Sequence, residues 1–201
     1  MGTTIYSIGH GRKTFEELLK ELNSYQISYL IDVRTVPYSK WSPQFNQEVI
    51  KSELNSKTNI KYDWWADRES DTYIGGRPLD NSCFDDDGYF DYYKMAKYPS
   101  FHKGLERLVM AQEKGFKVAL MCSESDPSEC HRSKLIGREL YVQYKINMLH
   151  IIDSHKIITE EDVISKLTKG RWPDMFHSAM PTFKSRKQYR KVEHLEYEYN
   201  D

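Results

Sequence analysis

The sequence predicts an α/β protein in which a mainly parallel sheet lies between helices in a three-layer α/β/α arrangement. Segments of β type and of helical type alternate along the 201 residues. Two of the β-type runs, 28–33 (SYLIDV) and 116–122 (FKVALMC), are almost continuously apolar, which is typical of strands buried on both faces. Parallel neighbours also need long crossover connections, and the helical segments between the runs can supply them.

The first strand and helix are expected near the amino terminus. Residues 4–8 (TIYSI) form a short β-type run. Thr14 and Glu17 have the spacing of a capping box, which marks a helix start. Apolar residues then recur at helical spacing: Phe15, Leu18, Leu19 and Leu22.

The middle of the chain repeats this order and then loses its regular pattern. Residues 28–33 predict a second strand, 47–57 (QEVIKSELNSK) a helix and 60–65 (IKYDWW) a third strand. Residues 66–92 are rich in Asp, Gly, Pro and Asn. A loop of that length is usually functional or mobile.

The second half predicts two further strands and three helices. They are expected, in order, at 100–114 (helix), 116–122 (strand), 131–144 (helix), 146–152 (strand) and 159–167 (helix). We assign residues 1–158 to one α/β domain. Residues 159–201 hold a helix and a charged tail, which belong to the same domain or form an appendage.

Composition narrows the class of protein. The formal net charge of −1 gives no general attraction to nucleic acid, so any such binding would need a local patch. No run approaches the roughly 18 apolar residues of a membrane span, and the opening MGTTIYSIGHGRKT lacks an apolar signal segment. A soluble cytoplasmic protein is expected, with no membrane partner. Three cysteines favour free thiols or a local site over a disulfide framework.

Polar residues and glycines follow each of the first four predicted strands. In open α/β sheets, ligands bind beyond the carboxyl ends of the strands, so these groups would share one edge of a parallel sheet. They are Gly9, His10, Gly11 and Arg12 after the first strand, Asp32 and Arg34 at the second, Gly75, Gly76 and Arg77 after the third, and Cys122, Glu124, Asp126, Cys130, His131 and Arg132 at the fourth.

The segment after the fourth strand contains the largest number of reactive and ionisable side chains. A helix beginning near residue 130 would present unpaired N–H groups and a positive dipole end to an anion. Arg132 would add a bidentate donor for phosphate or carboxylate. A Cys122 thiol facing that helix end would have its thiolate favoured. Glu124 suits a general base and His131 a proton shuttle.

These motifs resemble a known family. "SIGHG", "IDVRTVPYS", the pair "GG" and "LMCSESDPSECHRSKLIGREL" are similar to the pieces found in the family catalogued as domain of unknown function 488. The resemblance covers roughly residues 3–155 and implies a three-layer α/β fold in a prokaryotic cytoplasmic protein, without implying a reaction. It points to His10, Asp32, Arg34, Gly75, Gly76, Cys122, Glu124, Cys130, His131 and Arg132. The chain departs from the family pattern at "WWADRESDTYIGG", where the two tryptophans and the acidic stretch would alter the substrate.

Other readings of the cysteine segment stay open. A buried thiol, a turn and a helix cap would need no ligand. A phosphatase or rhodanese loop does not fit, because Arg132 follows Cys122 by ten positions. Zinc would use Cys122, Cys130 and His131, with His10 as a fourth ligand, but the spacing is unlike the usual ligand pairs, so we predict no metal or other cofactor. Cys122 and Cys130 could instead form a redox pair.

Three more residues or segments have structural alternatives. Asp32 and Arg34 could form an internal ion pair that orients Arg34. His10 could be a hydrogen-bonded structural histidine. Residues 184–191 (KSRKQYRK) form a basic patch with one tyrosine that is compatible with nucleic-acid contact, although we interpret it as a solvated helix face.

We therefore expect an enzyme of hydrolysis or group transfer, acting on an anionic, nucleotide-like substrate or a nucleic-acid base. Arg34 and Arg132 would bind the anion, with His10, Gly75, Gly76 and Cys130 beside them. Glu124 or Asp32 would activate water or a substrate hydroxyl, and Cys122 and His131 would assist. The alternatives are a nucleotide- or nucleic-acid-binding module without catalysis, and a thiol redox or zinc protein. The sequence indicates no oligomeric state.

Overall fold

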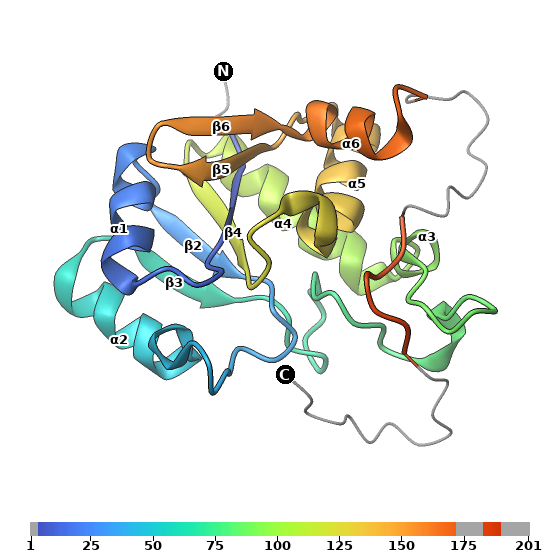
Figure 1. Cartoon of the computed structure of the whole chain (residues 1–201), viewed down its shortest axis with the longest axis horizontal. Helices are drawn as coiled ribbons and strands as arrows, with labels where there is room; N and C mark the ends of the chain where they lie inside the picture. Colours follow the sequence, from blue (N-terminus) through green and yellow to red (C-terminus); the bar gives the residue numbers. More distant parts are fainter. Residues whose placement is uncertain (1–3, 172–182, 190–201) are drawn as a thin grey trace.

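The computed structural model describes residues 4–171 and 183–189. Its centre is a six-stranded sheet with the order β3-β2-β4-β1-β5-β6 (Figure 1). The strands are β1 (Tyr6–Gly9), β2 (Tyr29–Asp32), β3 (Lys61–Trp64), β4 (Val118–Cys122), β5 (Leu149–Asp153) and β6 (Lys156–Thr159). Strands β1 to β5 are parallel, and β6 is antiparallel to β5. The α/β class is confirmed, with a sheet that is mixed although mostly parallel.

Strand β6 is an element that the sequence pattern missed. Only residues 154 and 155 separate it from β5. A connection of two residues cannot cross over the sheet, so the next strand has to pair antiparallel, as a hairpin. It lies at the outer edge of the sheet beside β5 (Figure 1).

The helices follow the predicted order, except that the four-residue helix α3 was not predicted. They are α1 (Phe15–Ser24), α2 (Gln47–Lys57), α3 (Tyr92–Met95), α4 (Pro99–Glu113), α5 (Arg138–Tyr144) and α6 (Glu160–Thr168). Thr14 and Glu17 form the expected capping box at α1. The helix predicted at 131–144 begins with a π-helical segment, η4 (Arg132–Gly137), and continues as α5. None of the described helices has the length and apolar character needed to cross a bilayer.

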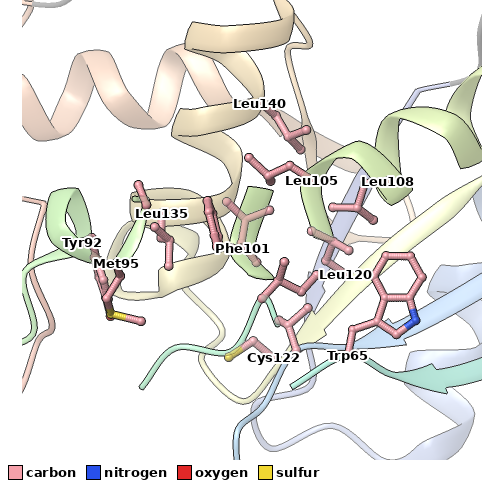
Figure 2. Packing of buried hydrophobic residues seen from close by; sticks show 14 of the residues in the cluster. Trp65, Tyr92, Met95, Phe101, Leu105, Leu108, Leu120, Cys122, Leu135 and Leu140 are labelled. Atoms are coloured by element: carbon pink, nitrogen blue, oxygen red, sulfur yellow. The ribbon is translucent and has the colours of Figure 1, made fainter. Parts of the chain in front are cut away.

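Alternate residues of β4 belong to two different apolar clusters. Ala119 and Met121 join the cluster that contains buried residues of α1 and α2. Val118, Leu120 and Cys122 join the cluster that contains α4, η4 and α5 side chains. Figure 2 shows Cys122 at the margin of this second cluster, beyond Leu120. The reactive end of β4 is therefore anchored by buried apolar contacts.

The strand register brings the polar ends of four strands together. Gly9 at the end of β1 is opposite Cys122 at the end of β4. Asp32 at the end of β2 is opposite Met121 on one side and Trp64, the end of β3, on the other. Because these strands are parallel, the loops that follow them leave from the same edge of the sheet.

A buried polar network ties the hairpin edge of the sheet to η4. Ser7 Oγ lies 2.6 Å from His150 Nδ1, and His150 Nε2 lies 2.6 Å from a carboxylate oxygen of Glu160. The other oxygen of Glu160 accepts a hydrogen bond of 2.9 Å from the Ser133 hydroxyl. All four side chains are 0 % exposed, so each polar group depends on the others for a partner.

Residues 183–189 run back along the 84–91 segment (Figure 1). Asp91 and Lys184 form a β-bridge, and Ser185 N–H donates to the Phe90 carbonyl at 3.0 Å. The rings of Phe90 and Tyr189 are stacked with centroids 4.0 Å apart. The interpretation of 184–191 as a helix face is wrong for 184–189, because this stretch forms no helix and pairs with residues 88–91 of the domain. Residues 190–201, including the acidic end, lie outside the described residues.

Candidate functional site

A cavity of about 220 Å³ lies at the edge where the polar loops meet. Its lining comes from the loop after β2, the Gly76–Arg77 turn, Phe90 and Tyr92, the segment after β4, and residues 185–189. Six of the ten residues singled out in the sequence line it: Arg34, Gly76, Cys122, Glu124, Cys130 and His131. His10, Asp32, Gly75 and Arg132 do not.

Two thiols and an imidazole form the floor of the cavity. Nε2 of His131 lies 3.1 Å from the Val33 carbonyl oxygen. A carbonyl can only accept, so Nε2 carries the hydrogen and Nδ1 carries the lone pair of a neutral ring. Nδ1 lies 3.9 Å from Cys122 Sγ and 3.7 Å from Cys130 Sγ. The segment 122–131 therefore folds back so that three soft or basic atoms converge.

The structure reverses the expectation for which thiol ionises. Burial opposes ionisation of Cys130, but hydrogen bonding from Cys122, the charge of Arg132 and the Arg132 backbone N–H together lower the pKa of Cys130 to about 7. The hydrogen bond to Cys130, together with burial, raises the pKa of Cys122. The thiolate is thus favoured at Cys130 and disfavoured at Cys122. The first N–H of η4 points at Cys130 Sγ, 3.5 Å away, so the helix end already faces a sulfur of the protein itself.

Arg132 is held away from the cavity. It is 0 % exposed, and its two terminal nitrogens donate to the carbonyls of Glu124 and Ser125. Its Nε is buried without a partner among the described residues. A bidentate contact with a ligand in the cavity does not fit this arrangement, because the side chain is fully buried and is not among the residues that line the cavity. Arg132 instead fixes the turn that carries Glu124.

Asp32 and Arg34 form a buried ion pair, with 2.5 Å between Nη2 and Oδ2. Asp32 also accepts from the Tyr62 hydroxyl at 2.7 Å. Nη2 of Arg34 donates in addition to the Phe45 carbonyl, and Nη1 lies 3.3 Å from His10 Nε2. Since a guanidinium has five N–H groups, these contacts leave one N–H on Nη1 for a further partner, and Arg34 is among the residues that line the cavity. The geometry favours the alternative in which Asp32 orients Arg34.

His10 contacts the guanidinium of Arg34 and is itself held by two further contacts. Its ring is stacked on Phe45 with centroids 4.5 Å apart. Nδ1 lies 3.0 Å from the Gly11 carbonyl, so Nδ1 donates there and Nε2 can accept from Arg34. Burial, and then the charge of Arg34, lower the pKa of His10 to about 4. His10 is therefore a neutral, structural histidine at pH 7.

Replacing His10 by Gln should flatten the pH dependence of stability in weak acid. The unfolded-state pKa of histidine is about 6.5, and the folded-state pKa of His10 is about 4. The neutral ring therefore contributes fully above pH 6.5, and about 3 kcal/mol of unfolding free energy is lost as pH falls from about 6.5 to about 4. Urea unfolding at several pH values measures this slope. Parallel slopes for wild type and His10→Gln would contradict the assignment.

Two glycines allow close packing around the cluster. A Cβ on Gly9 would lie 2.0 Å from the Glu124 carbonyl oxygen. The first glycine of the "SIGHG" motif is therefore needed for the turn after β4 to pack against the end of β1. A Cβ on Gly76 would lie 2.5 Å from Nδ1 of His131. Gly76 thus lets the backbone of this turn pack directly against the imidazole. Gly75 packs against the Tyr73 ring instead.

Charged and aromatic side chains complete the lining of the cavity. Glu124 lines the cavity and pairs with Arg186 at 3.2 Å, and both side chains are partly exposed. Arg77 and Lys187 line it as well, beside the rings of Phe90, Tyr92 and Tyr189. Sequence reasoning gave the site no residue of the 185–189 stretch. The signal was present in the basic, tyrosine-containing "KSRKQYRK", but sequence could not show that this stretch returns to the sheet edge.

Residues 14–138 match the family model described as "Domain of unknown function DUF488". The chain belongs to the DUF488 family. The matched segment of this DUF488 protein includes Arg34, Gly76 and the whole thiol–imidazole cluster, whereas His10 and residues 185–189 lie outside it. No curated protein and no solved structure is significantly similar to the chain.

Proposed function

We propose that this DUF488 protein is an enzyme that hydrolyses, or transfers a group from, a small anionic substrate of nucleotide type in the cavity. The observation that carries the proposal is the shared lining: Arg34, Arg77, Arg186 and Lys187 meet the thiol–imidazole cluster in one cavity of about 220 Å³. Cationic rims concentrate anions, and polar groups that converge in a concave site are the usual mark of a functional site.

The aromatic lining supports a substrate with a planar ring. Phe90, Tyr92 and Tyr189 contribute to the same wall, and Phe90 and Tyr189 are already stacked. Aromatic side chains stack on nucleobases regardless of sequence. The phosphate or carboxylate of the substrate would then face Arg34 and Lys187.

Glu124 is the proposed general base. Its carboxylate lies at the cavity on a turn fixed by Arg132, and its ion pair with Arg186 keeps it close to an incoming anion. Glu124 would accept a proton from water or a substrate hydroxyl as that oxygen attacks. It would return the proton to the leaving group, which balances the reaction. A cytoplasmic location is part of the proposal, because the three cysteines are free.

Ligand-induced stabilisation tests the substrate class. Wild type, Lys187→Ala and, as a control, Lys51→Ala on α2 would be melted with inorganic phosphate, sulfate, nucleoside phosphates, a nicotinamide dinucleotide and short oligonucleotides. A ligand at about 100 times its dissociation constant should stabilise wild type and Lys51→Ala by about 2.7 kcal/mol. Lys187→Ala should bind it more weakly. Equal stabilisation of all three proteins would show that the anion binds outside the cavity. No stabilisation of any of them would contradict anion binding.

Turnover separates an enzyme from a binding module. With the stabilising ligand as substrate, Glu124→Gln should lower kcat by about 10²- to 10⁴-fold while largely preserving the ligand-induced shift in melting temperature. A ligand that binds to wild type without turnover would contradict catalysis and favour the binding module.

A further inference from the structure

We propose that Cys122, Cys130 and His131 bind one Zn²⁺ ion whose fourth coordination position opens into the cavity. The binding site rests on the arrangement of these three side chains alone. The role of the ion, which is to activate the attacking water, rests on the proposed function.

The distances between the three ligand atoms suit a tetrahedral ion. Zinc bonds of about 2.3 Å to sulfur and 2.0–2.1 Å to nitrogen place tetrahedral sulfur and nitrogen ligands about 3.5 Å apart. Nδ1 of His131 is 3.9 Å from Cys122 Sγ and 3.7 Å from Cys130 Sγ. The three ligand atoms all lie within 4.8 Å of one another, on buried side chains. Small side-chain shifts would therefore complete the coordination.

The surroundings of His131 fit those of a metal ligand. Nε2–H donates to the Val33 carbonyl at 3.1 Å, which fixes the tautomer and leaves the Nδ1 lone pair toward the sulfurs. Metal-bound histidines usually make such a hydrogen bond with the second ring nitrogen. Gly76 packs against the ring, where a Cβ would come within 2.5 Å of Nδ1, so a larger residue at position 76 would displace the imidazole.

The structure also identifies which residues are not ligands. His10 is committed on both ring nitrogens, to the Gly11 carbonyl and to Arg34. Cys83 lies in a separate contact, with its sulfur 3.0 Å from the Tyr98 hydroxyl. Three protein ligands with a fourth position facing a cavity are typical of catalytic zinc, whereas structural zinc has four. Cys122, Cys130 and His131 all line that cavity.

The charges and protons of the site balance. Binding Zn²⁺ would release the protons of the two thiols, and the two thiolates would neutralise the ion. A water molecule at the fourth position would lose a proton to Glu124 and attack as hydroxide. Sulfur ligands favour zinc over magnesium or calcium, which prefer oxygen.

Cobalt titration tests the binding site directly. The full-length protein would be purified under reducing conditions, stripped with a chelator and titrated with Co²⁺. We expect one Co²⁺ per chain, with sulfur-to-cobalt charge-transfer bands and tetrahedral ligand-field bands that Zn²⁺ abolishes. Cys130→Ser and His131→Asn should weaken Zn²⁺ binding on the order of 100-fold or more, and Cys83→Ser, the matched control, should bind as wild type does.

The result that overturns the metal site does not depend on the folding of a variant. Wild-type protein without thiolate–cobalt bands, or Cys83→Ser weakened as much as Cys130→Ser, would rule it out. If the protein binds no metal and loses two free thiols under oxidant, a Cys122–Cys130 redox pair would replace the metal site as the explanation of the cluster.

The two proposals can fail separately. Zinc binding without turnover of any ligand would contradict the proposed function but support the metal site. Full turnover by the stripped protein would leave the proposed function standing and remove zinc as its activator.

Discussion

Asp32→Asn should destabilise the protein by about 3–5 kcal/mol. Arg34 is 4 % exposed, and Asp32, which is 0 % exposed, is its only described acidic partner. The substitution keeps the shape of the side chain and removes its charge. The guanidinium then remains buried without compensation, which is the costly way to break a buried ion pair. Urea unfolding at pH 7 measures the difference.

Asp63→Asn is the matched control for this prediction. Asp63 lies on β3, the strand next to Asp32, and also pairs with an arginine, Arg107, at 3.4 Å. Its side chain is 51 % exposed, so the ion pair is screened by water and should contribute less than about 1 kcal/mol. Equal effects of the two substitutions would show that burial of the Asp32–Arg34 pair is not what matters. Anion binding at the cavity should weaken only in Asp32→Asn, because Arg34 loses its orientation.

Glu160→Ala should cost roughly 3 kcal/mol or more in unfolding free energy. The Glu160 carboxylate accepts from His150 Nε2 at 2.6 Å and from the Ser133 hydroxyl at 2.9 Å. Its removal leaves two buried donors without an acceptor, and each should lower the unfolding free energy by about 1–3 kcal/mol. It also leaves a cavity beside Gly137. Because Ser133 belongs to η4, the segment after His131 should also loosen. Hydrogen exchange of residues 132–137 would report this.

Glu161→Ala is the control for the second prediction. Glu161 is the next residue in the first turn of α6, so both variants lose the same favourable interaction with the helix dipole. It is exposed, and its carboxylate accepts a long hydrogen bond of 3.4 Å from Asn147 Nδ2, at the protein surface. A change below about 1 kcal/mol is expected. Similar losses in both variants would refute the network as the cause.

The sequence by itself determined the class of the fold and the order of its main elements. Periodicity was sufficient because the central strands β1, β2 and β4 are mostly buried in apolar surroundings and the longer helices carry one apolar face. Local chemistry also placed the start of α1, since the Thr14–Glu17 capping box involves residues only three positions apart. Strand β6 was missed because its Lys156–Thr159 run lies at an exposed edge and follows β5 after only two residues, without a helix between them.

The sequence also located the reactive segment, since the ends of parallel strands share one edge whatever their order. It could not assign roles within that segment. Cys122 and Cys130 are chemically identical in sequence, and their order of ionisation depends on which sulfur receives the Arg132 N–H and charge. Arg132 and Arg34 look equally suited to an anion, yet only Arg34 reaches the cavity.

Tertiary structure alone decided the composition of the site. The 185–189 stretch joins the cavity through pairing of residue 184 with residue 91, a contact between positions 93 apart in the chain. The tautomer of His131 depends on the Val33 carbonyl, 98 positions away. Such contacts leave no local pattern, because the free energy that fixes them comes from packing and hydrogen bonding between distant segments rather than from the propensity of either one.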